Sequence, residues 1–364
     1  MNRRRFILCS SLAAAHASLS PSLPFALAQA NPPRANLRRE KVDDHLDLAL
    51  TYLRSQQKPD GSICDNDFGR LAMTSLSIIA FLSMGHMPSD KTPEGETIRR
   101  ALTFVLRPEN QERNGYLGKR DNSRMYGHGI TSLMLAEVAG MGVDEPHDKL
   151  VLDRLQKALD LILKSQAVKK DAANQGGWRY EPESVDSDLS ISVWQVMALR
   201  SAKNAGIEVP SKAIDSAVAF LKSTYKSRRD SKGVPFDMRS GFTYVPQMQV
   251  TFSSATAGML AMQVCGQYDA PEVKGTTEWL TTMRPELQWG EQWFFYGTYY
   301  YAQAMHQLGG KLAERAGREV ERVLIPQQRK DGSWPPSESG AVYATSLAVL
   351  SLSVKYHYLP IYQR

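Results

Sequence analysis

The sequence predicts an all-α protein made of six helical hairpins, and three observations support this fold class. Amphipathic segments with helical spacing of apolar residues recur along the chain from residue 41. Each is followed by a glycine-containing loop and then by a second helix rich in small residues. No run of valine and isoleucine alternates with polar residues, so no sheet is expected.

The first helix of each hairpin has one apolar face and one charged face. In the second hairpin, the i, i+3, i+4, i+7 pattern is formed by Ile98, Ala101, Leu102 and Val105. The same spacing recurs in two more hairpins, at Val151, Leu155, Ala158, Leu159 and Ile162 and at Ile214, Ala217, Val218 and Leu221. Such helices bury a single face, as expected of an outer layer that meets solvent on its other side.

The loops inside the hairpins share a glycine followed by an aromatic or small residue. The sixth loop is Gln328-Arg329-Lys330-Asp331-Gly332-Ser333-Trp334, and the first is Gln57-Lys58-Pro59-Asp60-Gly61-Ser62. The third, fourth and second loops are shorter versions, namely Gln175-Gly176-Gly177-Trp178, Gly241-Phe242 and Gly115-Tyr116-Leu117-Gly118. Asp-Gly favours a turn with positive φ. We expect the aromatic side chain that follows to fill the seam between adjacent hairpins.

The second helices begin with related tripeptides. Three are nearly identical, namely Thr74-Ser75-Leu76, Thr131-Ser132-Leu133 and Thr345-Ser346-Leu347. Looser copies are Leu189-Ser190-Ile191, Thr256-Ala257-Gly258 and Thr298-Tyr299-Tyr300. Recurrence at intervals of roughly 40–70 residues is typical of a repeat array. Small residues allow such helices to crowd together in an inner ring.

A Gln-x-x-x-Gly-x-Trp loop before a small-residue helix resembles the repeats of squalene and oxidosqualene cyclases and the related loops of protein prenyltransferase β subunits. Residues 331–347 match this pattern best, followed by residues 177–199. The resemblance covers about residues 41–358 and implies that the domain at 41–364 is an α/α toroid, a six-hairpin barrel with six parallel inner helices inside six outer ones. Cyclases, prenyltransferases, binding domains and lyases share this toroid, so the resemblance implies a fold without fixing an activity.

The N-terminus has the features of a signal peptide spanning residues 1–30. A basic segment, Arg3-Arg4-Arg5, precedes an apolar stretch that ends in small residues suited to cleavage. Residues 2–7 also fit a twin-arginine signal, and export by the Sec route is the alternative. Residues 31–40 are expected to form a flexible tether. These features predict a periplasmic or secreted protein.

Composition excludes some partners of the mature chain. The formal net charge is +6, and removal of the three arginines of the signal peptide leaves 41 basic residues against 38 acidic ones. That balance gives no reason to expect a nucleic-acid partner.

No later stretch reaches about 18 uninterrupted apolar residues, so no membrane span is expected in the mature chain. A disulfide between Cys64 and Cys265 stays an open alternative to two free thiols.

An acidic segment before the third inner helix carries the catalytic hypothesis. The resemblance places here the Asp-x-Asp-Asp-Thr acid motif of the cyclases. In a literal alignment, Asp186 and Asp188 supply two of the carboxylates, and Leu189 replaces the last one. In the alignment by repeats, Asp188 is the last aspartate and Ser187 stands at the protonating position. The alternative is that Asp186 or Asp188 caps the helix, because free N–H groups favour carboxylates there.

Further candidates lie in other hairpins. His128, at the start of the second inner helix, is a candidate general base, with a capping or surface role as the alternative. The candidate ligand-binding residues are aromatic, namely Trp178, Tyr180, Trp293, Phe295, Tyr296 and Tyr299. Aromatic faces stabilise cations, including carbocations, and packing of the core is the alternative role. The seven histidines are scattered and no Asp-x-Cys precedes an inner helix, so neither a metal nor another cofactor is expected.

The leading hypothesis is an exported toroid that binds an elongated apolar, isoprenoid-type ligand at its centre, with acid-driven cyclase or isomerase activity. One alternative is a non-catalytic toroid that binds a peptide, a glycan or a protein partner. The other is a polysaccharide lyase or hydrolase, and a hydrolase would need two facing carboxylates. The squalene cyclases that the chain resembles use two barrels, so a single barrel argues against a full polycyclisation chamber.

Overall fold

The computed structural model describes residues 39–141, 144–283, 287–336, 339–356 and 358–363. The predicted signal peptide at 1–30 and most of the predicted tether at 31–40 lie outside this part of the chain. Among the described helices, none is long and apolar enough to cross a membrane.

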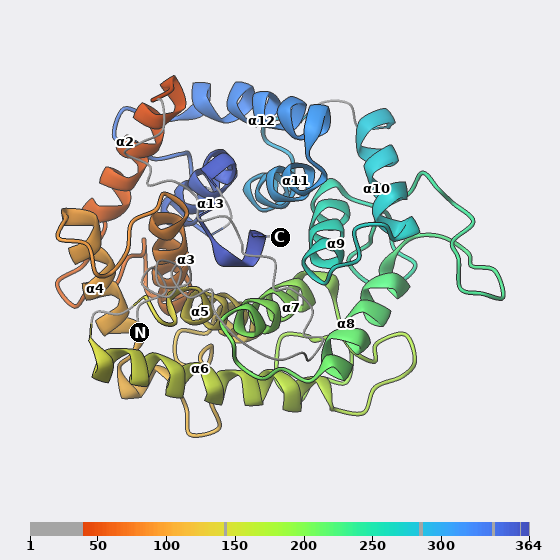
Figure 1. Cartoon of the computed structure of the whole chain (residues 1–364), viewed down its shortest axis with the longest axis horizontal. Coiled ribbons are helices and arrows are strands. Elements are labelled where there is room, and N and C mark those ends of the chain that lie inside the picture. Colours follow the sequence, from red (N-terminus) through yellow and green to blue (C-terminus); the bar gives the residue numbers. More distant parts are fainter. Residues whose placement is uncertain (1–38, 142–143, 284–286, 337–338, 357, 364) are drawn as a thin grey trace, which may run out of the picture.

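Twelve α-helices alternate between an outer and an inner ring over the described ranges (Figure 1). The outer helices are α2 (Lys41–Ser55), α4 (Pro93–Val105), α6 (Glu145–Gln166), α8 (Ser211–Thr224), α10 (Pro271–Thr282) and α12 (Gly310–Leu324). The inner helices are α3 (Arg70–Ser83), α5 (Arg124–Val138), α7 (Leu189–Asn204), α9 (Phe252–Val264), α11 (Phe294–Leu308) and α13 (Ala341–Leu352). The described residues form no strand beyond isolated bridges. The predicted fold class, an all-α toroid of six hairpins, is confirmed.

The inner ring is closed. Each inner helix contacts the inner helices of the two neighbouring hairpins, and α13 of the last hairpin contacts α3 of the first. The inner helices α3, α5, α9 and α13 are buried almost all round, as expected of helices rich in small residues that are surrounded by other helices. The outer helices bury one face each, and the predicted apolar residues of α4 all lie on its buried face.

A glutamine side chain joins neighbouring hairpins in four of the six units. In the last unit, Gln328 Nε2 donates to the carbonyl oxygens of Gly332 at 3.0 Å and of His45 at 2.8 Å, which ties the sixth hairpin to the first. The equivalent bonds run from Gln57 to Gly61 and Thr97, from Gln111 to Gly115 and Arg154, and from Gln166 to Gly176 and Ala213. In the third unit the bridging residue is therefore Gln166 at the end of α6, and not the Gln175 of the loop pattern.

The glycine of the same loops is required by close backbone packing. Gly61, Gly115, Gly176 and Gly332 have φ values between +92° and +96°. A Cβ atom at each would lie 2.1 to 2.3 Å from a carbonyl oxygen of the next outer helix. Only glycine combines this left-handed conformation with such an approach.

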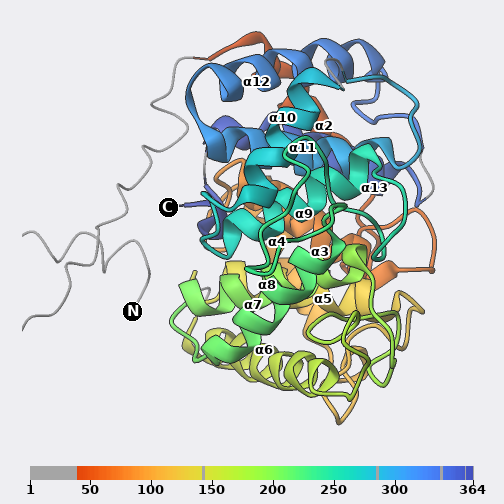
Figure 2. The ribbon, with the colours of Figure 1, turned by 90° about the vertical axis from the view of Figure 1, so that its right-hand side faces the viewer.

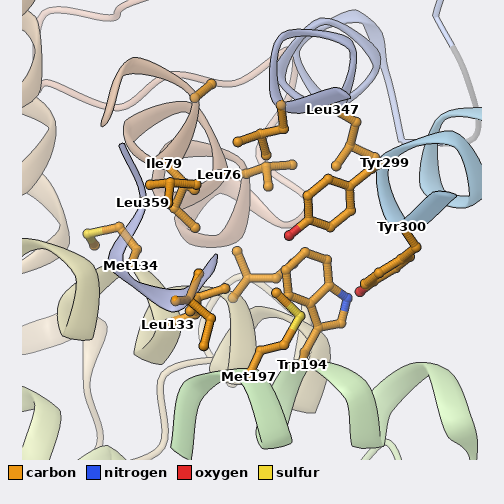
Figure 3. Close-up of a cluster of buried hydrophobic side chains, with 14 of the residues drawn as sticks. Leu76, Ile79, Leu133, Met134, Trp194, Met197, Tyr299, Tyr300, Leu347 and Leu359 are labelled. Atoms are coloured by element: carbon orange, nitrogen blue, oxygen red, sulfur yellow. The ribbon is translucent and has the colours of Figure 1, made fainter. Parts of the chain in front are cut away.

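The chain's own C-terminal segment covers one end of the barrel. After α13, the 3-10 helices η4 (Val354–Tyr356) and η5 (Pro360–Tyr362) lead to the C-terminus, which Figure 2 shows at one end of the barrel in side view. Gln307 Nε2 donates to the carbonyl oxygen of Tyr362 at 2.8 Å, and η5 contacts α7. In Figure 3, Leu359 lies beside Ile79 and Leu133 at the centre of the ring. We call this covered end the floor, and the opposite end, where the inner helices begin, the entry end.

Candidate functional site

The interior of the inner ring changes from apolar at the floor to polar at the entry end. Aliphatic side chains of the inner helices meet Leu359 of the C-terminal segment inside the ring, among them Leu76, Leu133, Met134 and Leu347 (Figure 3). Beside these side chains, the ring of Trp194 stacks on that of Tyr299, with centroids 6.0 Å apart and planes 9° apart. Tyr300 packs against both of these rings. The polar layer at the entry end is built around Asp188.

Asp188 caps the N-terminus of α7. Its Oδ1 accepts hydrogen bonds from the backbone N–H of Ile191 and from Ser190 Oγ, both at 2.8 Å. The alternative role that the sequence suggested for this aspartate is therefore present in the structure. The cap involves Oδ1 of the carboxylate. The other oxygen, Oδ2, contacts side chains outside α7.

The second oxygen of Asp188 joins a partly buried network with two tyrosines and an arginine. Tyr244 OH donates to Asp188 Oδ2 at 3.2 Å, and Tyr180 OH lies 2.5 Å from Tyr244 OH. Arg179 Nε lies 3.5 Å from Oδ2, and its guanidinium covers the rings of Tyr180 and Tyr244. The Asp188 side chain is fully buried, and burial raises its pKa above the usual range, although these hydrogen bonds and Arg179 act in the opposite direction.

Asp186 and Ser187, the neighbours in the predicted acid motif, are placed differently. Asp186 is more than half exposed and pairs with Arg179 at 3.5 Å. Ser187 is buried, and its hydroxyl donates to the carbonyl oxygen of Asn174 at 2.7 Å, so it is directed into the preceding loop. Lys170 Nζ contacts the same serine at 3.2 Å, and burial lowers the pKa of Lys170 to about 8. The structure therefore brings one aspartate, and not a pair, into the interior.

Tyrosines from several hairpins converge on this entry end. Tyr126 OH lies 2.5 Å from Ser190 Oγ, and the ring of Tyr126 is 6.1 Å from that of Tyr180. Tyr296 lies close enough to Tyr126 and Asp188 for their charges to raise its pKa, although burial is the main cause of the increase. Of these residues, Tyr180 and Tyr296 were predicted from the sequence as ligand-binding, whereas Tyr126, Tyr244 and Trp194 were not. Tyr126 stood two residues before a selected histidine, and Tyr244 follows the loop aromatic Phe242 by two residues, as the selected Tyr180 follows Trp178.

The other predicted aromatic residues have three kinds of position. Trp178 and Phe295 are buried, and Trp178 Nε1 donates to the carbonyl oxygen of Ile162 at 2.8 Å, so this tryptophan fills the interior of its hairpin. Tyr299 is buried beside the floor, where its hydroxyl bonds that of Tyr362. Trp293 is 46% exposed at the start of α11 and has a left-handed backbone with φ of 57°. Of these four, Trp293 alone presents much surface to solvent.

His128 has a structural role rather than the predicted role of a general base. It is completely buried, its Nδ1 accepts the backbone N–H of Leu117 at 3.2 Å, and its Nε2 bonds the carbonyl oxygen of Ala158 at 3.1 Å. Thr74 and Thr345 accept the equivalent backbone N–H groups in the first and sixth hairpins. Both ring nitrogens are occupied by the scaffold, and burial lowers the pKa of His128 to about 4. A neutral, fully bonded imidazole cannot take a proton from a ligand.

The structure also shows the state of the two cysteines and the arrangement of potential metal ligands. Cys64 and Cys265 are free thiols, and burial raises the pKa of Cys265 to about 12. Among the residues with described positions, no group of three or more histidine, cysteine, aspartate or glutamate side chains is arranged to hold a metal ion.

Comparison with known proteins finds similarity among solved structures. No family model and no curated protein matches the chain. Among solved structures, the chain is similar to a type II terpene cyclase from Scytonema in complex with its substrate, geranylgeranyl dihydroxybenzoate. The match has 11% sequence identity and a TM-score of 0.36, and it covers 90% of this chain and 99% of that chain. Since this score is low, the fold assignment depends on the helices and contacts described above.

Proposed function

We propose that this chain is an exported toroid that binds an elongated apolar, isoprenoid-type ligand through the entry end of its inner ring. The observation that supports this proposal is the layered interior. Partly exposed tyrosines stand at the entry end, and the packed rings of Trp194, Tyr299 and Tyr300 lie with aliphatic side chains in the interior that the C-terminal segment closes at the floor. Ligand sites of this kind combine mostly apolar walls with a few polar groups that orient the ligand.

A second candidate function is acid-driven cyclisation or isomerisation of the same ligand. It is favoured by the burial of Asp188, which raises the pKa of this carboxyl group. An alkene is protonated only by an acid whose proton is directed at it, however, and both oxygens of Asp188 already accept hydrogen bonds from Ile191, Ser190 and Tyr244. The arrangement therefore supports binding more directly than turnover, and we propose binding as the primary function.

Extraction of the purified mature protein, followed by mass spectrometry, tests the binding proposal first. We expect an apolar molecule in near-stoichiometric amount. Binding of farnesol, followed by quenching of tryptophan fluorescence, provides the second test, and Trp194→Leu should weaken it at least tenfold. The matched control is Trp279→Leu, which changes a partly buried tryptophan on the outer helix α10. Equal loss of farnesol affinity in both variants would contradict a site inside the ring.

The catalytic candidate is tested with Asp188→Asn. Asparagine is also a good helix cap, so the variant should fold and bind farnesol with little change. Incubation of the wild-type protein with farnesol and geranylgeraniol, followed by gas chromatography, would detect cyclised or isomerised products. Product formation by the wild-type protein that disappears in Asp188→Asn would establish the enzyme, and absence of product from both would leave a binding protein.

Export is a separate part of the proposal. It is supported by the twin-arginine pattern within residues 2–7. Replacement of Arg3, Arg4 and Arg5 by lysine keeps the segment basic but removes the paired arginines. We expect the precursor to stay in the cytoplasm, as detected by fractionation, and unchanged export would instead indicate the Sec route.

A further inference from the structure

Two tyrosine hydroxyl groups of α11 are buried without a hydrogen-bond partner. Within the described part of the chain, neither Tyr296 OH nor Tyr300 OH has a protein partner in hydrogen-bonding geometry. The two rings meet edge to face, with centroids 4.6 Å apart, and each hydroxyl is near enough to shift the pKa of the other, but the pair does not have hydrogen-bond geometry. Buried polar groups in native proteins are nearly always hydrogen-bonded, and an exception calls for an explanation.

The other tyrosines of the site do not share this property. Tyr126 OH bonds Ser190, Tyr180 and Tyr244 bond each other, and Tyr244 also bonds Asp188. The unpartnered pair is thus confined to one face of α11, since residues four apart lie on the same side of a helix.

These two hydroxyls lie between the polar and the aromatic layers. Tyr296 is near Asp188 and Tyr126 of the entry end. Tyr300 packs on Trp194 at a centroid distance of 5.9 Å, and Figure 3 shows its hydroxyl directed toward that tryptophan. A ligand that enters past the tyrosines would therefore meet both hydroxyls before it reaches the apolar floor.

We propose that the ligand carries a neutral oxygen group, a hydroxyl or a carbonyl, that hydrogen-bonds Tyr296 and Tyr300. The inference rests on the proposed function and narrows its ligand class from isoprenoid hydrocarbons to oxygenated isoprenoids such as isoprenyl alcohols and ketones. An anionic group fits less well, because the nearby Arg179 already pairs with Asp186 and Asp188. A site whose buried polar groups await a partner rejects an analogue that lacks it, since those groups stay unpaired in the complex.

The test compares farnesol with farnesene, a hydrocarbon of the same chain length. Their affinities for the mature protein are measured by tryptophan fluorescence and expressed as a ratio, in the wild-type protein and in the double variant Tyr296→Phe with Tyr300→Phe. We expect the preference for farnesol to fall at least tenfold in the double variant. The control is Tyr301→Phe, on the same helix, which removes a hydroxyl that donates to Glu319 at 2.7 Å on the outer side. It should leave the ratio unchanged.

Thermal unfolding without ligand provides a second, independent measurement. Removal of two unpaired hydroxyls should leave the Tm unchanged or raise it, whereas Tyr301→Phe should lower it. A double variant whose Tm falls as far as that of Tyr301→Phe would mean that the hydroxyls already have partners, and the inference would be overturned. An unchanged ratio in the double variant would overturn it as well, while the binding proposal would stand. Failure of the wild-type protein to bind either compound would overturn both.

Discussion

Acidification should destabilise this protein through His128. The imidazole is completely buried and its pKa is lowered to about 4, whereas in the unfolded chain it titrates near 6.5. For a base whose pKa is lowered by folding, the stabilising contribution is present above pH 6.5 and is lost as the pH falls toward 4, because the unfolded chain then binds the proton first. The difference between the two pKa values corresponds to roughly 3 kcal/mol of unfolding free energy, a large part of the stability of a typical domain.

Urea unfolding at several pH values between 7 and 4 measures this effect, and the variant His128→Thr isolates it. Threonine occupies the equivalent position in two other hairpins, at Thr74 and Thr345, and accepts the same backbone N–H. The variant should be less stable at pH 7, because it loses the bond to Ala158 and some buried volume. Between pH 6.5 and 4 the wild-type protein should lose roughly 3 kcal/mol more than the variant. Parallel stability curves for the two proteins would refute the assignment of His128 as a buried neutral base.

Three other variants test the helical scaffold and the entry end of the inner ring. Gln328→Ala removes the bonds to His45 that tie the sixth hairpin to the first, together with the bond to Gly332 inside its own loop, and should lower the unfolding free energy by about 1–3 kcal/mol in urea unfolding. Gly115→Ala places a Cβ 2.1 Å from the Lys157 carbonyl oxygen and should lower the Tm much more than Gly206→Ala, which has a similar φ of +84° but no atom within 4 Å. Trp293→Gly should raise stability by about 1 kcal/mol through relief of its left-handed backbone, while it weakens farnesol binding; a lower Tm would show that the indole stabilises the fold.

The fold could be predicted from the sequence because its determinants are local. The apolar residues of α4 follow the helical period, and each of them lies on the buried face that this period defines. Gly61 and Gly332 stood in Asp-Gly turns, and both have the positive φ expected there. Each such feature depends on residues within one or two helical turns, and its repetition along the chain compensates for the weakness of any single copy.

The site was predicted only in part, because its contacts join different hairpins. Asp188 belongs to the third hairpin, whereas Tyr244, which bonds its second oxygen, lies 56 residues later in the loop before α9. No local pattern indicates that such residues meet. The prediction of His128 as a general base failed for another reason, because the sequence did contain a pattern that indicates its structural role. Leu117 precedes His128 by 11 residues, the same interval that separates Trp334 from Thr345, and alignment of these loops would have placed the histidine in the scaffold.

Alignment of the repeats also separates the structural role of Asp188 from the contacts that are particular to the third hairpin. It stands four residues before Ser192, which accepts the backbone N–H of Trp178, and the positions four residues before Thr74 and Thr345 are Arg70 and Ala341. The helices that begin there, α3 and α13, have glycine as their N-cap residue, and carboxylates of other loops accept the N–H groups of their first turns instead, Asp121 from Leu71 and Asp65 from Val342. Burial of a charge is unfavourable unless hydrogen bonds and a counterion compensate for it, and the third hairpin supplies these from Arg179 and from Tyr244 of another unit. A carboxylate at the start of the inner helix thus belongs to the scaffold in all three hairpins, and the contacts of its second oxygen with Arg179 and Tyr244 are what the third hairpin adds.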